Sequence, residues 1–354
     1  MWSQEFSING KKIGIGHPTF IIAEAGVNHN GDIHLARKLI DVAARSGADA
    51  VKFQTFKSEK VATFQAKKAE YQETTTRSDE SQLEMIKKLE LPFSSFRELQ
   101  EYSRSKGLIF LSTPFDLESL DFLAELDVPA FKISSGELIN PLLLKKAVDY
   151  RKPIILSAGM ATLGEIETAL DLISQRGENR LALLHCITSY PAPIEIANLR
   201  AIQTLRNAFR TIVGYSDHTL GTTAMIVAVT LGAKVIEKHF TLDKSLPGPD
   251  HKASADPEEL DRMIKEIRRT EASLGDGIKI PSQAELDIAK IARRSIVASR
   301  DLKKGEFITE DAIELKRPAE GLAPKYLDLI MGKKLNQDVK ADSFIIFRMI
   351  EWDN

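Results

Sequence analysis

A repeated order of apolar, β-rich run and amphipathic helical stretch extends along most of this chain. Eight apolar runs occur, at residues 20–26, 50–56, 109–115, 130–136, 153–160, 181–187, 211–217 and 234–240. They are continuous rather than alternating, which is typical of parallel strands buried on both faces. The stretches after them carry apolar residues at i, i+3 and i+4, as amphipathic helices do. Eight β-α units therefore predict an α/β fold, a closed (β/α)₈ TIM barrel spanning residues 1–275.

An open, doubly wound sheet is the alternative that the same pattern allows. Nucleotide-binding sheets of that kind carry closely spaced glycines in the first turn between strand and helix. The first such turn here reads AGVNHNGD, from Ala25 to Asp32, and lacks that spacing. The barrel is therefore the favoured interpretation.

The sequence changes in character after about residue 275. Residues 276–290 are predicted to be a linker and residues 291–354 a small domain with little helix, because short strands, a KKGE turn and scattered Gly and Pro follow one another. A domain of that size buries little core, so we expect it to dock on another surface. Within the barrel, residues 57–80 form a long polar connection that is predicted to be a flap over the barrel mouth.

Composition limits the classes of partner. The 354 residues carry a formal charge of −2, so no basic surface for nucleic acid is expected. No apolar run approaches the roughly 20 residues of a membrane span, and the first residues lack the order of a signal peptide, which predicts a cytoplasmic protein. Cys186 is the only cysteine, which excludes an internal disulfide and a multi-cysteine zinc site. Any bound metal must be held by histidine and carboxylate.

Active sites of such barrels lie at the carboxyl ends of the strands. Polar side chains occur at this end of every predicted strand, and their coincidence at one rim predicts a functional site. They are Glu24, Lys52, Gln54, Thr113, Lys132, Ser134, Ser135, Ser157, Thr188, Tyr190, Ser216, Asp217, His218, Glu237, Lys238 and His239.

Two histidines in this set point to a divalent cation. His218 and His239 end neighbouring strands, so both imidazoles could bind one ion whose other positions stay open to substrate and water. Nearby carboxylates, Glu24 and Asp250, and oxygen-rich ligands favour Mn²⁺ or a related ion. The alternative is a pair of neutral histidines hydrogen-bonded at the rim.

Two lysines within apolar runs point to an anion. Lys52 and Lys132 would be costly to bury without a negative partner, and a bound phosphate or carboxylate would supply one. Hydroxyls of Thr113, Ser135 and Ser157 add hydrogen-bond donors at the same depth. The combination suits a small, multiply charged anion such as phosphoenolpyruvate. A pyruvate-dependent Schiff-base aldolase also needs a strand lysine and remains an alternative.

The chain carries, in order, FIIAEAGVNHNGD, AVKFQTFKSEK, KAEYQ, FLSTPFD, FKISSGE, PIILSAGMAT, LLHCITSYPAP, GYSDHTLG and IEKHFTLDKSLPGPDH. Together these stretches resemble the N-acetylneuraminate (sialic acid) synthase family. The later stretch LKKGEFITEDAIELKRPAEG resembles the family's antifreeze-like (SAF) domain, a β-clip-type fold. The resemblance implies an enzyme that condenses phosphoenolpyruvate with N-acetylmannosamine and water and gives N-acetylneuraminate and phosphate. It also implies a bound Mn²⁺, Mg²⁺ or Co²⁺ ion and a domain-swapped homodimer.

The resemblance also implies roles for individual residues. His218 and His239 match the metal ligands, with Asp250 at the metal or a bound water, and Glu24 matches a carboxylate that acts as acid or base. Arg317 matches an arginine that reaches the sugar in the partner subunit. The matching positions for phosphoenolpyruvate are Lys52, Thr113, Lys132, Ser135, Ser157 and Ser216, and those near the sugar are Gln54, Thr188 and Tyr190.

Two departures from the family pattern bear on the acceptor sugar. Thr188 stands where many sialic acid synthases have Asn, and RPAEG, from Arg317 to Gly321, replaces RPGNG. N-acetylmannosamine is the expected acceptor, and 2,4-diacetamido-2,4,6-trideoxymannose, giving N,N'-diacetyllegionaminate or the pseudaminate precursor, is the alternative. A noncatalytic sugar-binding protein is a more distant alternative, because a fold does not assign a function.

Overall fold

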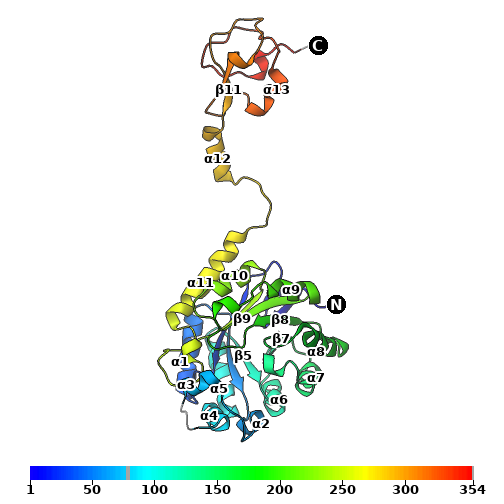
Figure 1. Cartoon of the computed structure of the whole chain (residues 1–354), viewed down its shortest axis with the longest axis vertical. Coiled ribbons are helices and arrows are strands. Elements are labelled where there is room, and N and C mark those ends of the chain that lie inside the picture. Colours follow the sequence, from blue (N-terminus) through cyan, green and yellow to red (C-terminus); the bar gives the residue numbers. More distant parts are fainter. Residues whose placement is uncertain (77–79, 353–354) are drawn as a thin grey trace. The chain divides into compact units, whose positions relative to one another are not determined.

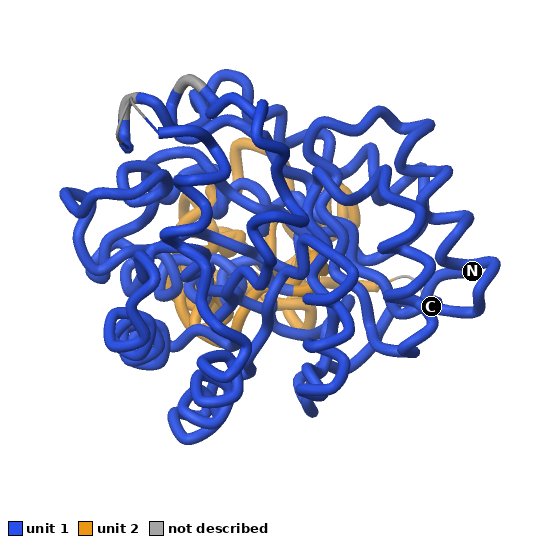
Figure 2. Tube along the Cα trace, turned by 90° about the horizontal axis from the view of Figure 1, so that it is seen from below, with its two compact units in different colours: residues 1–275 blue, residues 276–354 orange. Residues whose placement is uncertain are grey.

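The computed structural model describes residues 1–76 and 80–352. Residues 1–275 form one compact unit and residues 276–354 a second one. Figure 1 labels their elements and Figure 2 colours the two units separately.

The first unit is built on eight parallel strands in the order β5-β4-β3-β10-β9-β8-β7-β6. The outermost strands of this order, β5 and β6, also pack against each other, so the sheet closes as a barrel. The predicted (β/α)₈ fold is confirmed. The strands are β3 (Phe20–Gly26), β4 (Ala50–Thr55), β5 (Ile109–Pro114), β6 (Phe131–Ile133), β7 (Ile154–Ser157), β8 (Leu181–Cys186), β9 (Ile212–Asp217) and β10 (Val235–His239).

Helices follow the strands and lie outside the sheet (Figure 1). Their starts are fixed by local capping: Thr162 and Glu165 form a capping box at α8, and Asp256 and Glu259 form one at α11. The helices are α1 (Ile33–Arg45), α2 (Ser58–Val61), α3 (Glu70–Thr75), α4 (Gln82–Leu89), α5 (Phe93–Ser105), α6 (Leu117–Glu125), α7 (Pro141–Asp149), α8 (Leu163–Gln175), α9 (Ala201–Phe209), α10 (Thr223–Thr230) and α11 (Pro257–Leu274).

The connection 57–80 contains the short helices α2 and α3. Its residues 77–79 lie outside the described part of the chain, and its action as a flap stays a prediction.

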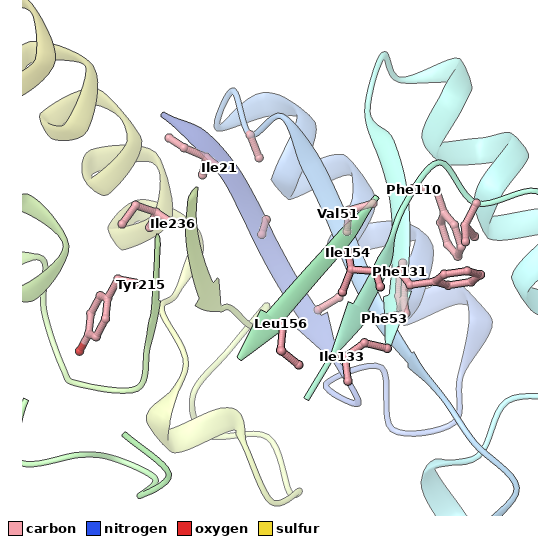
Figure 3. Close-up of a cluster of buried hydrophobic side chains, with 14 of the residues drawn as sticks. Ile21, Val51, Phe53, Phe110, Phe131, Ile133, Ile154, Leu156, Tyr215 and Ile236 are labelled. Atoms are coloured by element: carbon pink, nitrogen blue, oxygen red, sulfur yellow. The ribbon is translucent and has the colours of Figure 1, made fainter. Parts of the chain in front are cut away.

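Strand side chains alternate between two apolar layers. One layer, including Ile21, Val51 and Ile236, packs between the sheet and the helices (Figure 3). The other, including Ile22 and Val235, fills the barrel interior. The period of two therefore decides which polar residues at the strand ends point inward.

An N-terminal hairpin that the sequence analysis did not anticipate adds to the inner layer. Strands β1 (Glu5–Ile8) and β2 (Lys11–Gly14) pair antiparallel, and Ile8 and Ile13 pack with the inner barrel residues. The turn residues Asn9 and Gly10 have φ of 47° and 83°. An Asn-Gly pair between short strands is a strong hairpin signal, so the sequence did contain it. The hairpin packs with residues at the amino ends of the strands, opposite the polar end.

The second unit has its own apolar core, which includes Ile296, Leu335 and Ile345. Its strands β11 (Ser295–Ala298) and β12 (Ile313–Lys316) pair antiparallel, and α13 spans Leu327–Ile330. A further helix, α12 (Gln283–Ala292), begins inside the predicted linker, where a Ser282–Glu285 capping box starts it. Short 3₁₀ helices complete the chain at Ser135–Glu137, Ile194–Ile196, His251–Ala253, Glu310–Ala312, Pro324–Tyr326 and Phe347–Met349.

None of the helices in the described ranges combines the length and the apolar composition that a membrane crossing requires.

Candidate active site

Alternation along the strands places the polar ends of four strands inside the barrel. On β3, Glu24 follows Ile22 at a spacing of two, and on β4 Lys52 follows Ala50 in the same way, where Ile22 and Ala50 belong to the inner apolar layer. The rule carries Ser216 on β9 and Glu237 and His239 on β10 to the same inner side. Apolar side chains occupy the deep positions and polar ones the positions nearest the mouth.

These residues line a cavity of about 330 Å³. Fourteen of the sixteen polar residues predicted at the strand ends contribute to it: Glu24, Lys52, Gln54, Thr113, Lys132, Ser134, Ser135, Ser157, Thr188, Tyr190, Ser216, His218, Glu237 and His239. Glu137, Met160 and Cys186 also line it.

Two buried lysines and two buried carboxylates form the floor of this cavity. Lys52 Nζ lies 2.7 Å from Glu24 Oε2 and donates to Thr113 Oγ1 at 2.8 Å. Lys132 Nζ lies 3.3 Å from Glu237 Oε1 and Lys52 Nζ 3.8 Å from Glu237 Oε2. All four charged side chains are almost fully buried, so their mutual pairing is what makes their burial tolerable.

This pairing corrects one expectation from the sequence. We expected Lys52 and Lys132 to require a bound anion as partner, whereas the protein itself supplies Glu24 and Glu237. Glu237 received no role beyond its place at a strand end. Its spacing of two from His239 could have indicated a role in the site, because both side chains must then point inward from β10.

The two carboxylates have different environments. Burial raises the pKa of Glu24 above its ordinary value, and Lys52 offsets only part of this effect. Burial also acts on Glu237, but Lys132, Lys52 and the Ser216 hydroxyl, which donates to Glu237 Oε1 at 2.9 Å, lower its pKa overall. Carboxyl groups whose pKa values are driven apart can take separate roles, with Glu24 able to exchange a proton and Glu237 a permanent anion.

Two imidazoles lie beside this cluster. The ring centres of His218 and His239 are 5.5 Å apart, which two ligands of one ion can span at metal–nitrogen bonds of about 2.1 Å. His218 Nδ1 lies 2.6 Å from the carbonyl oxygen of Ile187, so Nδ1 donates and Nε2 keeps its lone pair. Burial lowers the pKa of both histidines, which keeps them neutral and able to ligate.

The donor set around the imidazoles fits a cation that keeps open positions. His239 Nδ1 is buried without a hydrogen-bond partner among the described residues and lies 3.8 Å from Asp250 Oδ2. Within residues 1–76 and 80–352, no group of three or more His, Cys, Asp or Glu side chains is arranged to hold a metal. The two imidazoles could thus bind an ion whose remaining positions are filled by water or substrate oxygens.

Asp250 lines a second cavity of about 220 Å³ that adjoins the first. The two cavities share Gln54, Phe115, Tyr190 and His239. Tyr190 stacks on Tyr71 of α3 at 5.4 Å between ring centres and packs against His218 at 4.1 Å. Burial raises the pKa of Asp250 to about 6.

Three loops meet at the other side of the first cavity. Ser135 Oγ lies 3.4 Å from Thr188 Oγ1, and Gly159, at φ +44°, lies against both side chains. A Cβ at residue 159 would come within 2.3 Å of Ser135 Cβ and 2.8 Å of Thr188 Oγ1. Only glycine therefore permits this close approach of the β7 loop.

Three polar residues from the sequence analysis line neither cavity. Asp217 and Lys238 point away from the cavity and pair with each other at 2.7 Å, with Lys238 also donating to the Thr219 carbonyl. Asp217 follows Ser216 by one residue, and Lys238 follows Glu237 by one residue, so both side chains point to the opposite face of the sheet. Arg317 is exposed in the second unit, and its predicted role at the sugar stays a prediction.

The chain is similar to known proteins along almost its whole length. The NeuB family model matches residues 39–279, and the SAF domain model matches residues 293–351. The chain is 52% identical over 329 residues to the N,N'-diacetyllegionaminic acid synthase of Campylobacter jejuni, covering 92% of this chain and 98% of that relative. It is 46% identical over 349 residues to the protein of the same name from Legionella pneumophila, covering 97% and 98%.

A solved structure shows the same likeness. The N-acetylneuraminic acid synthetase of Leptospira borgpetersenii, crystallised in complex with citrate, matches with a TM-score of 0.72 at 39% identity, covering 81% of this chain and 95% of that chain.

Proposed function

Because this chain belongs to the NeuB family, we propose that it is a phosphoenolpyruvate-dependent nonulosonic acid synthase. In the proposed reaction, phosphoenolpyruvate, an amino-sugar aldehyde and water give a nine-carbon sugar acid and phosphate. The observation that carries the proposal is one barrel mouth at which two buried lysines, two carboxylates and two neutral imidazoles meet.

The lysine cluster is the proposed site of phosphoenolpyruvate. The two lysines and two carboxylates balance while Glu24 is ionised, and uptake of a proton by Glu24 leaves a net positive charge that favours an anionic guest. Ser157 Oγ is buried without a hydrogen-bond partner among the described residues and can donate to that guest.

His218 and His239 are proposed to hold a divalent cation. Mn²⁺ is the proposed ion, and Mg²⁺ and Co²⁺ are alternatives. Such an ion, when bound, polarises the aldehyde oxygen as a Lewis acid. The protein's own part is to keep both rings neutral and to orient the His218 ring through the Ile187 carbonyl.

Glu24 is proposed to move the proton that the reaction transfers. C3 of phosphoenolpyruvate forms a bond to the aldehyde carbon, and the aldehyde oxygen takes up a proton as it becomes a hydroxyl. Water then adds to C2 and releases a proton. A carboxyl group whose pKa is raised by burial can donate the first proton and accept the second. Lys52 at 2.7 Å and the Gln54 amide at 3.3 Å orient it. Cleavage of the bond between C2 and the ester oxygen then releases phosphate, and the C2 hydroxyl proton passes to the departing phosphate as C2 becomes the keto carbon.

For the acceptor, we propose 2,4-diacetamido-2,4,6-trideoxymannose, with N,N'-diacetyllegionaminate as the product. Support comes from the two relatives named as diacetyllegionaminic acid synthases, which the chain matches along almost their whole length. N-acetylmannosamine, the acceptor expected from sequence motifs, has less support.

A phosphate-release assay over both acceptors tests the proposal. The purified chain is mixed with phosphoenolpyruvate, Mn²⁺ and each sugar in turn, and kcat/KM is measured. We expect turnover with both kinds of sugar and a preference for the diacetamido sugar. Saturable sugar binding without phosphate release would instead indicate a noncatalytic sugar-binding protein.

We further propose that the SAF unit acts in a domain-swapped homodimer, in which Arg317 reaches the sugar of the partner subunit. Arg317→Ala is expected to raise the sugar KM about 10-fold with phosphoenolpyruvate KM unchanged, because a hydrogen bond from a charged group is worth about 1.5 to 3 kcal/mol. Arg348→Ala, another exposed arginine of the same unit, is the matched control. An unchanged sugar KM in the Arg317 variant would remove Arg317 from the site.

A further inference from the structure

The second cavity differs in chemistry from the first. Four of its polar side chains, Gln54, Tyr190, His239 and Asp250, lie at or beside its junction with the first cavity, and Tyr71 and Gln72 of α3 are the other two. Most of the remaining wall is apolar, and we call it the apolar lobe. The lobe is lined by Val27, Phe56, Val61, Met85, Ile86, Leu89 and Phe115.

Most of the apolar lobe is a packed wall, and Val61 is its exposed member. Val27, Phe56 and Leu89 form one buried cluster, against which Ile86 and Phe115 pack. Phe56 and Phe115 meet edge to face with ring centres 6.4 Å apart.

Two kinds of element build the lobe. Val27, Phe56 and Phe115 come directly after β3, β4 and β5, so they stand at the same rim as the catalytic group. Met85, Ile86 and Leu89 come from α4, whose start is fixed by a Ser81–Glu84 capping box.

We propose, on the basis of the proposed function, that the apolar lobe receives the 6-deoxy end of the acceptor and selects against a hydroxyl there. An acceptor whose reacting end lies at His239 has its other end within reach of this lobe, because the shared residues join the two cavities. A methyl group fits the apolar walls, whereas a hydroxyl packed against them would lose its water without a hydrogen bond from those side chains. Tyr71 and Gln72, the polar lining residues away from the junction, stand on α3 and not on the lobe.

The test compares two acceptors that differ in one oxygen atom: 2,4-diacetamido-2,4,6-trideoxymannose and its 6-hydroxy counterpart. The wild-type ratio of kcat/KM is expected to favour the deoxy sugar roughly 10- to 100-fold, the range in which an apolar pocket discriminates against an added hydroxyl. Met85→Gln, which places an amide in the lobe at similar volume, is expected to bring the ratio to within about 3-fold of unity.

The matched control is Met160→Gln, the same change in the other cavity, where the ratio should stay at its wild-type value whatever happens to the rate. Ile86→Gln supplies a second lobe variant if Met85→Gln fails to fold. A wild-type ratio near unity, or a ratio that neither lobe variant alters, overturns the lobe proposal and leaves the synthase proposal standing. No phosphate release with either sugar would instead refute the synthase proposal itself.

Discussion

Replacement of His239 by Ala is expected to lower metal-dependent turnover by more than about 100-fold while the barrel stays folded. Mutation of a residue that only hydrogen-bonds to a metal ligand lowers metal affinity or activity about 10- to 100-fold. Loss of one of the two imidazole ligands themselves should therefore lower activity further. Phosphate release at saturating Mn²⁺ gives the activity, and elemental analysis of the dialysed protein gives the bound metal. His218→Ala should behave in the same way.

His185→Ala is the matched control for this prediction. His185 lies on β8, is buried, and makes a 2.8 Å hydrogen bond between Nε2 and the Ala197 carbonyl, outside the cavity. Its loss should reduce stability but leave the metal content at the wild-type level. Wild-type metal content and turnover in His239→Ala would show that the imidazole pair holds no ion.

Glu237→Gln is expected to lower the free energy of unfolding by about 3 kcal/mol, because breaking a buried ion pair leaves its partners uncompensated. Here the partners are two, Lys52 and Lys132, and both are almost fully buried. Urea unfolding with an unchanged m-value measures the loss. Added phosphoenolpyruvate should restore more stability to the variant than to the wild type.

Glu137→Gln provides the control, because Glu137 lines the same cavity but is only half-buried and accepts a hydrogen bond from Asn140. A change within about 0.5 kcal/mol is expected for it, as for most exposed substitutions. Equal stability losses in the two variants would mean that the lysine pair does not depend on Glu237.

The barrel could be predicted because each apolar run carries its own signal. The run 20–26 coincides with β3, and the runs 50–56 and 109–115 exceed β4 and β5 by one residue at the carboxyl end. Which polar side chains at the strand ends point into the barrel follows from the same period of two. The hairpin at Asn9-Gly10 was equally readable from its turn and was missed.

The counter-ions of the lysines could not be predicted in this way. The pairing of Lys132 on β6 with Glu237 on β10 joins strands that are not neighbours in the sheet, so it depends on how the closed barrel is tilted and staggered. The apolar lobe likewise combines loop residues with α4, which no strand pattern links. The role proposed for Arg317 would require a second subunit, which one chain's sequence does not describe.

The most direct test of the central proposal is turnover in ¹⁸O-labelled water with phosphoenolpyruvate, Mn²⁺ and the diacetamido sugar. Mass spectrometry of both products decides the outcome. We predict one phosphate for each nonulosonic acid formed, with no label in the phosphate, because water attacks carbon and the C–O bond breaks. Labelled phosphate, or phosphate released without sugar, would contradict the proposal.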